Sequence, residues 1–161
     1  MIRRALILLP LVARAQDGFP PRAPGGLELH GVAAPRYLGF RVYEAALYLA
    51  APAAVPEQVA DPSLVLVRYL RRVVLADLRR AWLPSLGEPL NPGFDAWLRE
   101  LSPGDEEHFA FTPAGARLEG PGRPALHLPP GPFTTMLRAS WLGAEAPAAL
   151  RQGWFRRPGR W

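Results

Sequence analysis

Proline and glycine interrupt this chain so often that its helices and strands must be short. Together they account for 35 of the 161 residues, and proline and glycine end regular elements or open turns. No apolar run reaches the roughly 18 residues typical of a membrane-spanning helix, which excludes a protein with several spans. The length fits one domain. Because the chain contains no cysteine, disulfides, cysteine-ligated zinc and thiol catalysis are excluded.

The first residues have the pattern of a signal peptide. A basic start, Met1-Ile-Arg-Arg, precedes the nine apolar residues 5–13, and Ala13-Arg14-Ala15 is a small-x-small cleavage motif. We therefore predict a signal peptide over residues 1–15, cleavage after Ala15, and a periplasmic or secreted protein. A buried N-terminal strand is the alternative.

Export changes the meaning of the basic composition. All 19 basic residues are arginines, and removal of residues 1–15 leaves 16 arginines against 14 acidic residues. Several of these arginines lie at the C-terminal end, so residues 16–150 carry a net charge of −2. No basic stripe crosses the folded region, which argues against a nucleic-acid partner. The tail 154–161 interleaves arginine with aromatics and predicts only a weak contact with a membrane surface.

Hydrophobic periodicity changes along the chain from strand-like to helical and back. Residues 16–26 predict an extended lead-in. Strands are predicted at 27–30, 37–50 (with a bulge at Gly39), 63–70, 108–112, 116–119 and 125–128. Helices are predicted at 75–86, at 91–101, at 133–142 and at 147–152. Pro84 should end or kink the first helix, Asn91-Pro92 should begin the second, and Gly153 should cap the last. This order predicts an α+β domain over residues 27–153, with a mostly antiparallel sheet.

Several segments resemble the chalcone isomerase-like family, in the form found as small exported bacterial proteins. They follow one another in family order over most of residues 27–153: Arg36–Leu49 (RYLGFRVYEAALYL), Leu66–Leu70 with the helix 75–82, Pro103-Gly-Asp105, the hairpin 111–115, and 133–150 with Trp141-Leu-Gly143. The resemblance implies an open-faced β-sandwich, in which a helical layer packs on one face of the sheet.

The family's enzymes cyclise a chalcone with a strand arginine, a threonine on the long strand and a tyrosine at the start of the next helix. These groups stabilise developing charge rather than form a covalent bond. Here the resemblance places Arg36 at the arginine position and Tyr43 at the threonine position, and Leu78 or a neighbour in 75–78 at the tyrosine position. Two of the three catalytic groups are therefore absent, so the resemblance implies a relative that binds a ligand without catalysis, as fatty-acid-binding members do.

The predicted ligand site contains Arg36, Tyr43, Tyr69 and Arg68, and we assign no catalytic residue, metal or cofactor. Arginine offers a fork that matches a carboxylate, so these residues could hold the head of an apolar acid. A straight strand would separate Arg36 from Tyr43 by about 23 Å, and a shared site therefore needs a sharp bend. Ordinary strand residues with exposed tips are the alternative.

Two other residue groups have simpler interpretations. The acidic run Asp105-Glu106-Glu107 before His108 predicts a solvated turn and strand start, because adjacent strand residues point to opposite faces. His30, His108 and His127 have no assigned role. The aromatic residues are expected to build the core, or to line a pocket between the layers: Trp82, Phe94, Trp97, Phe133 and Trp141.

Three functions remain open. The first is an exported binding protein for a small apolar or acidic amphipathic molecule, favoured by a closed apolar cavity with a buried arginine. The second is a related isomerase or intramolecular lyase, favoured by a cleft in which Arg36 and Tyr43 reach one point. The third is an envelope interaction module, favoured by a filled core with an exposed apolar patch.

Overall fold

A computed structural model describes residues 18–155. The predicted signal peptide and the end of the tail lie outside these residues. The strands are β1 (Arg22–Ala23), β2 (Leu27–Ala33), β3 (Arg36–Tyr37), β4 (Phe40–Arg41), β5 (Tyr43–Leu49), β6 (Ser63–Tyr69), β7 (Glu106–Thr112), β8 (Gly115–Glu119) and β9 (Leu126–Leu128). The helices are α1 (Leu75–Leu86), α2 (Pro92–Trp97), α3 (Pro132–Leu142) and α4 (Ala148–Trp154), with short 3-10 turns at Pro24–Gly26 and Pro56–Gln58.

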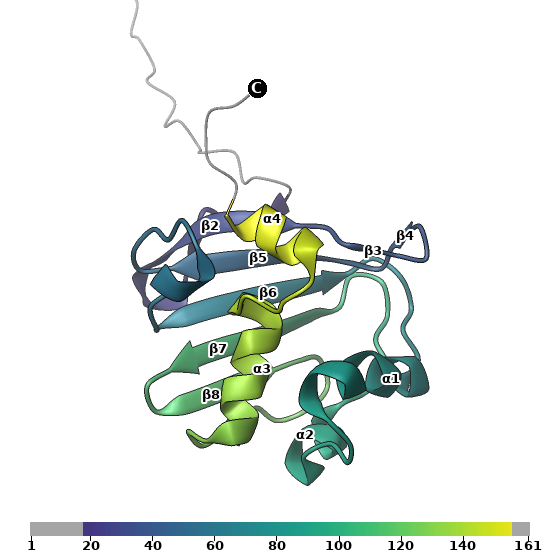
Figure 1. Ribbon diagram of the computed structural model, residues 1–161. Helices are drawn as coiled ribbons and strands as arrows, with labels where there is room; N and C mark the ends of the chain where they lie inside the picture. The colour runs from purple at the N-terminus through teal and green to yellow at the C-terminus, as the bar shows by residue number, and fades with distance from the viewer. Residues whose placement is uncertain (1–17, 156–161) are drawn as a thin grey trace, which may run out of the picture.

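Seven strands form one antiparallel sheet in the order β1-β2-β5-β6-β7-β8-β9. Helices α3 and α4 lie across one face of this sheet, and α1 and α2 lie beside them at one side (Figure 1). The prediction of an α+β fold with a helical layer on one face of a mostly antiparallel sheet is confirmed. None of the helices in residues 18–155 has the length and apolarity of a bilayer span.

The main core lies between the sheet and the helices. Alternate residues of β6 and β7, including Val65, Val67, Phe109 and Phe111, point into it and are buried. Because neighbouring strand residues face opposite sides, the same strands present Leu64, Leu66 and Ala110 as well as the polar residues Arg68, Glu106 and His108 to the other face. The aromatic rings of the helices pack against one another and against Phe109 of β7 with ring centroids 5.1–6.2 Å apart; Phe94 and Trp97 are stacked, and the other pairs are edge-on or tilted. Their predicted role in the core is confirmed, and these rings occupy the space between the layers.

The segment before Leu27 belongs to the folded body. Phe19 is fully buried on the helix-free face, with Leu27, Tyr48 and Leu66. The Tyr48 hydroxyl donates to the Pro20 carbonyl at 2.8 Å, and β1 pairs with β2 at the sheet edge. The lead-in therefore covers part of the face that carries no helix.

Two local predictions differ from the structure. The predicted strand 37–50 is divided, because Leu38 (φ 49°) and Gly39 (φ 82°) form a tight turn between β3 and β4 in place of a bulge. Helix α1 has the predicted bounds, with Pro84 inside its last turn rather than at its end. Helix α4 includes Gly153 and ends at Trp154, so Gly153 is not its cap.

Candidate functional site

Tyr43 and Tyr69 lie side by side on the helix-covered face. They are direct partners in the β5–β6 register, and their ring centroids are 6.2 Å apart. The Tyr43 ring also meets Trp141 of α3 edge-on at 6.1 Å. The structure therefore brings these two predicted site residues together, inside the main core.

Both phenols are poor acids in this environment. Burial raises the pKa of Tyr43 to about 12. Burial, followed by the neighbouring Glu107 carboxylate, raises the pKa of Tyr69 well above its ordinary value. A low-dielectric surrounding disfavours the phenolate, so both side chains remain neutral at physiological pH.

Tyr69 belongs to a buried polar network that was not predicted from the sequence. Its hydroxyl donates to Glu107 Oε1 at 2.7 Å, and the other oxygen of Glu107 pairs with the Arg123 guanidinium. Arg123 also donates to the Trp97 carbonyl at 2.6 Å and stacks over the Trp97 ring at 3.8 Å. The side chains of Arg123 and Glu107 are 2% and 0% exposed, so the pair is sealed within the protein.

The acidic run 105–108 was expected to be solvated, and that prediction is wrong for Glu107. Glu107 precedes Phe109 and Phe111 at two-residue spacing, and all three point to the core. Burial raises the pKa of Glu107, against the opposing effects of Tyr69 and Arg123. The two-residue spacing from Glu107 to the two phenylalanines indicates that all three side chains point to the same face of the sheet. No sequence pattern near Arg123 indicates that it is the partner of Glu107.

Arg68 lies on the opposite face from Tyr69. Its guanidinium donates to Glu106 at 3.1 Å and to Glu44 at 3.3 Å, and it also donates to the Gly18 carbonyl at 3.3 Å. The guanidinium stacks over the Phe19 ring at 4.4 Å. Two carboxylates of the neighbouring strands therefore hold the Arg68 guanidinium, which fastens the N-terminal segment to the sheet through Gly18 and Phe19.

Arg36 lies on the hairpin β3–β4, outside the main sheet. Its cross-strand partner is Arg41, and its guanidinium donates to the Gly39 carbonyl at the turn, at 3.2 Å. The sharp bend that a shared site required is present, yet the Arg36 head group is directed to the tip of the hairpin. The four predicted site residues thus fall into three places: a buried tyrosine pair, an ion-paired Arg68 and an exposed Arg36.

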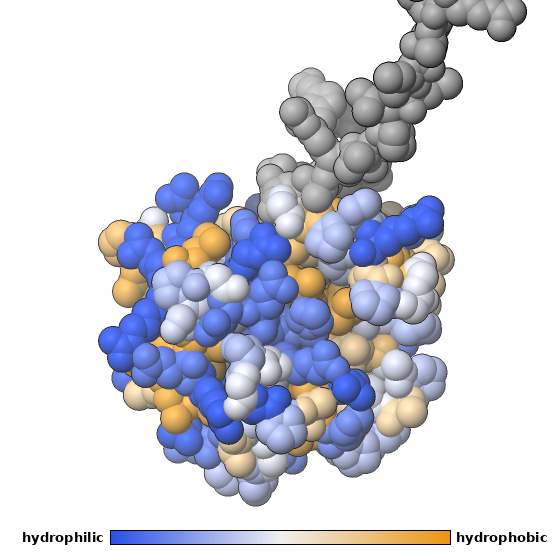
Figure 2. Space-filling model, turned by 180° about the vertical axis from the view of Figure 1, so that it is seen from behind, coloured by the Kyte–Doolittle hydropathy of each residue, from blue (hydrophilic) through white to orange (hydrophobic). Residues whose placement is uncertain are grey.

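A groove on the helix-free face is a candidate site for a ligand. It has a volume of about 290 Å³ and extends from the β1–β2 connection across β6, β7 and β8. Leu27, Leu64 and Ala110 supply apolar lining, while His108, Arg117 and Glu119 add polar groups. Figure 2, which views the molecule from behind, shows polar side chains interrupted by apolar patches on this side.

Arg117 is the cation of this groove. Its Nε donates to Glu119 Oε1 at 2.6 Å, and the side chain is 53% exposed. The two terminal guanidinium nitrogens have no protein acceptor among residues 18–155. An arginine in this state can bind an acidic group through its remaining N–H donors.

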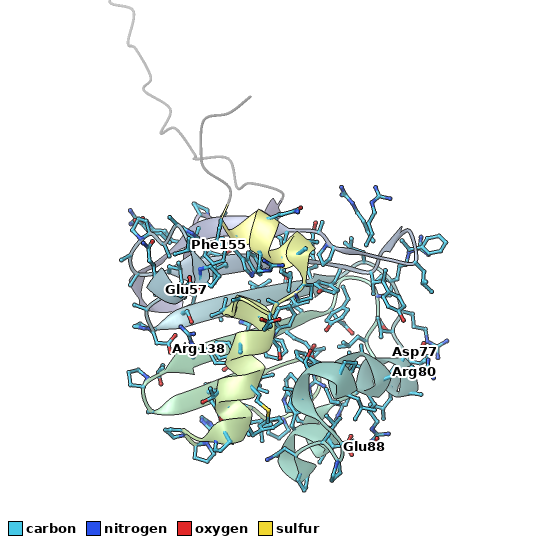
Figure 3. All side chains as sticks on the ribbon, viewed as in Figure 1. Glu57, Asp77, Arg80, Glu88, Arg138 and Phe155 are labelled. Carbon is cyan, nitrogen blue, oxygen red and sulfur yellow. The ribbon has the colours of Figure 1, made fainter. Side chains whose placement is uncertain are left out.

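A second, wider hollow of about 410 Å³ lies between the loop 54–57 and α4. Glu57, Arg151 and Phe155 are among its lining residues, and Figure 3 shows Glu57 and Phe155 on the α4 side of the molecule. Within the described part of the chain, no three His, Asp or Glu side chains are grouped so that they could hold a metal ion. No protein-family model matches the chain, and no curated protein matches it.

Proposed function

We propose that the protein is a non-catalytic binding protein that holds a small molecule with an apolar body and an acidic head. The site is the groove on the helix-free face, with Leu64 and Ala110 against the apolar body and Arg117 on the acid. This proposal keeps the expected ligand class but moves the site from a closed cavity at the predicted residues to an open groove with an exposed arginine. The filled core and the exposed apolar residues of the hairpin β3–β4 are the features expected of an interaction module, which is the second candidate function.

The observation that carries the proposal is the groove itself. Its volume of about 290 Å³ lies at the lower end of the range for small-molecule sites, and such sites combine apolar walls with a few polar groups. Burying an apolar chain against Leu27, Leu64 and Ala110 supplies affinity, and Arg117 supplies preference for an anion.

The chemistry of the core supports binding rather than catalysis. Tyr43 and Tyr69 are neutral and packed among aromatic rings, and Leu78, at the family's tyrosine position, is buried and apolar. Arg123 is occupied by Glu107. Glu107 accepts hydrogen bonds from both Tyr69 and Arg123, which supports a structural role for these groups rather than the stabilisation of charge on a substrate.

The resemblance to chalcone isomerase-like proteins and the signal-peptide pattern belong to the same proposal. The segment RYLGFRVYEAALYL and the motif Trp141-Leu-Gly143 favour the family, and the α+β fold with one helix-covered face is consistent with it. Export after cleavage at Ala15 would place the groove in the periplasm or outside the cell.

Native mass spectrometry of the protein isolated from its host, followed by solvent extraction, tests the proposal. We expect one bound amphipathic acid per chain. Ala110→Trp fills the groove and should abolish this adduct, whereas Ala76→Trp places the same ring on the exposed side of α1 and should leave it unchanged.

Two charge variants identify the acid contact. Arg117→Gln should weaken binding of a medium-chain fatty acid by about tenfold, while Glu119→Gln should strengthen it by removing a competing carboxylate. The proposal is contradicted if the bound molecule is still present in Ala110→Trp. It is also contradicted if the wild-type protein carries no ligand and binds none when fatty acids are added.

A further inference from the structure

The hairpin β3–β4 contributes little to the folded core. Its two strands pair only with each other, and Figure 1 shows them extending beyond the main sheet. Tyr37, Leu38 and Phe40 are 67%, 82% and 54% exposed, and none of them belongs to either apolar cluster. Three large apolar side chains within four positions form an exposed patch of the kind that marks an interaction site.

The same hairpin gathers arginines without acidic partners. Within residues 18–155, eight of the thirteen arginines form ion pairs with carboxylates, and three of the five that form none, Arg36, Arg41 and Arg71, lie at this hairpin. The Arg71 guanidinium lies over the Phe40 ring at 4.5 Å. The apolar tip is therefore accompanied by three cations, with no carboxylate to neutralise them.

The register separates the two kinds of side chain. Tyr37 is opposite Phe40, and Arg36 is opposite Arg41, so the aromatic pair and the arginine pair occupy opposite faces of the hairpin. Like charges directly across a strand pair repel each other. An anion between Arg36 and Arg41 would relieve this repulsion, which makes a negatively charged partner the complement of this surface.

We propose that the hairpin Arg36–Arg41 docks the protein on an anionic phospholipid surface. Leu38 and the two aromatic rings enter the interfacial region, where tyrosine and other amphipathic rings are favoured. Arg36 and Arg41 bind lipid phosphates, and Arg71 adds to the attraction. The tight turn suits insertion, because it leaves few backbone groups to desolvate. The docking surface is separate from the groove of the proposed function, so either can fail alone.

Vesicle flotation tests the docking. The protein recovered after expression of the full-length chain should float with vesicles that contain phosphatidylglycerol, but not with pure phosphatidylcholine, and high salt should release it. The double variant Arg36→Gln/Arg41→Gln should bind about 30-fold more weakly. Leu38→Asn removes the apolar tip and suits the positive φ of that position, so it should lower binding while preserving the hairpin.

Matched controls separate this surface from others. Arg99→Gln changes an exposed arginine that has no carboxylate partner in the described part of the chain, and Met136→Ser removes an exposed apolar side chain of α3. Both should leave flotation unchanged. A variant with Arg156, Arg157 and Arg160 changed to glutamine tests the tail. The proposal is overturned if vesicle binding depends on the tail and not on the hairpin. It is also overturned if the protein captures an acidic protein but does not float with vesicles.

The absence of cysteine allows a direct measurement of depth. A fluorophore on Leu38→Cys should shift to shorter wavelength on anionic vesicles, because the probe enters a less polar environment. The same probe on Met136→Cys should not shift. Equal responses at the two positions contradict insertion of the hairpin.

Discussion

The two faces of the sheet use charge in opposite ways. On the helix-covered face, one ion pair between Glu107 and Arg123 is sealed among aromatic rings. On the helix-free face, Arg68 and Arg117 pair with carboxylates while half-buried or exposed. Buried charges need full pairing because desolvation is costly, whereas half-exposed charges remain available to other molecules. The charged pair of the covered face therefore belongs to the core, and the open face carries the groove in which we propose that a ligand binds.

The largest expected effect comes from breaking the buried pair. Glu107→Ala leaves Arg123 uncompensated and Tyr69 without its acceptor, so we expect a loss of about 3–5 kcal/mol in the free energy of unfolding. Glu106→Ala, one residue earlier on the open face, should cost about 1 kcal/mol or less. Urea denaturation of both variants checks the comparison, and equal losses would refute the contrast between the faces.

The close packing of α4 on β2 predicts the next effect. A Cβ at Gly153 would lie 2.5 Å from Ala33 Cβ and 2.7 Å from the Val32 carbonyl oxygen. Gly153→Ala should therefore cost about 1–3 kcal/mol, although alanine is normally the better helix former. The adjacent, exposed Gln152→Ala serves as the control and should be neutral or slightly stabilising in thermal denaturation.

The tyrosine pair predicts a loss of stability at alkaline pH. Folding raises the pKa of Tyr43 from 10.0 to about 12, so the native state retains a proton that the unfolded chain releases. This contribution is present below pH 10 and is lost as the pH rises from about 10 to 12, at a cost on the order of 2 kcal/mol.

Tyr43→Phe removes this titration and should flatten the fall in stability over that range. Denaturation midpoints of the wild type and of Tyr43→Phe, measured from about pH 9 to 12, test this prediction, because this range includes the unfolded and folded pKa values of Tyr43. Tyr37→Phe, at an exposed position on the hairpin, should leave the profile unchanged. A slope that is identical in wild type and Tyr43→Phe would contradict the assignment.

The smallest effect concerns the N-terminal segment on the open face. Arg68→Met removes the contacts to Glu44, Glu106 and Gly18, which should cost about 1 kcal/mol because the arginine is partly solvated. The local effect should be larger than the global one, with faster amide exchange around Phe19. Unchanged exchange there would show that Phe19 holds the segment without Arg68.

Sequence patterns were sufficient for the elements and the fold class. The short apolar run of β6, the two-residue alternation of β7 and the helical spacing from Leu75 to Leu86 depend on each residue and its near neighbours. The N-cap Asn91 also follows from local chemistry, and its side chain accepts from the Phe94 amide. Local hydrogen bonding and one-sided burial set these features, so the sequence alone determines them.

The tertiary structure decided which polar residues meet. Arg123 follows Glu107 by sixteen residues, and only the return of the chain to the sheet places its guanidinium on that carboxylate. The turn at Leu38-Gly39 likewise depends on a leucine at positive φ, which local propensity does not favour. It divided the predicted strand and carried Arg36 away from Tyr43. The hairpin is held by the β3–β4 pairing and by the hydrogen bond from Arg36 to the Gly39 carbonyl, without help from the core. Which polar residues meet therefore depends on where the chain turns and returns, and this explains why the strands could be predicted but the location of the site could not.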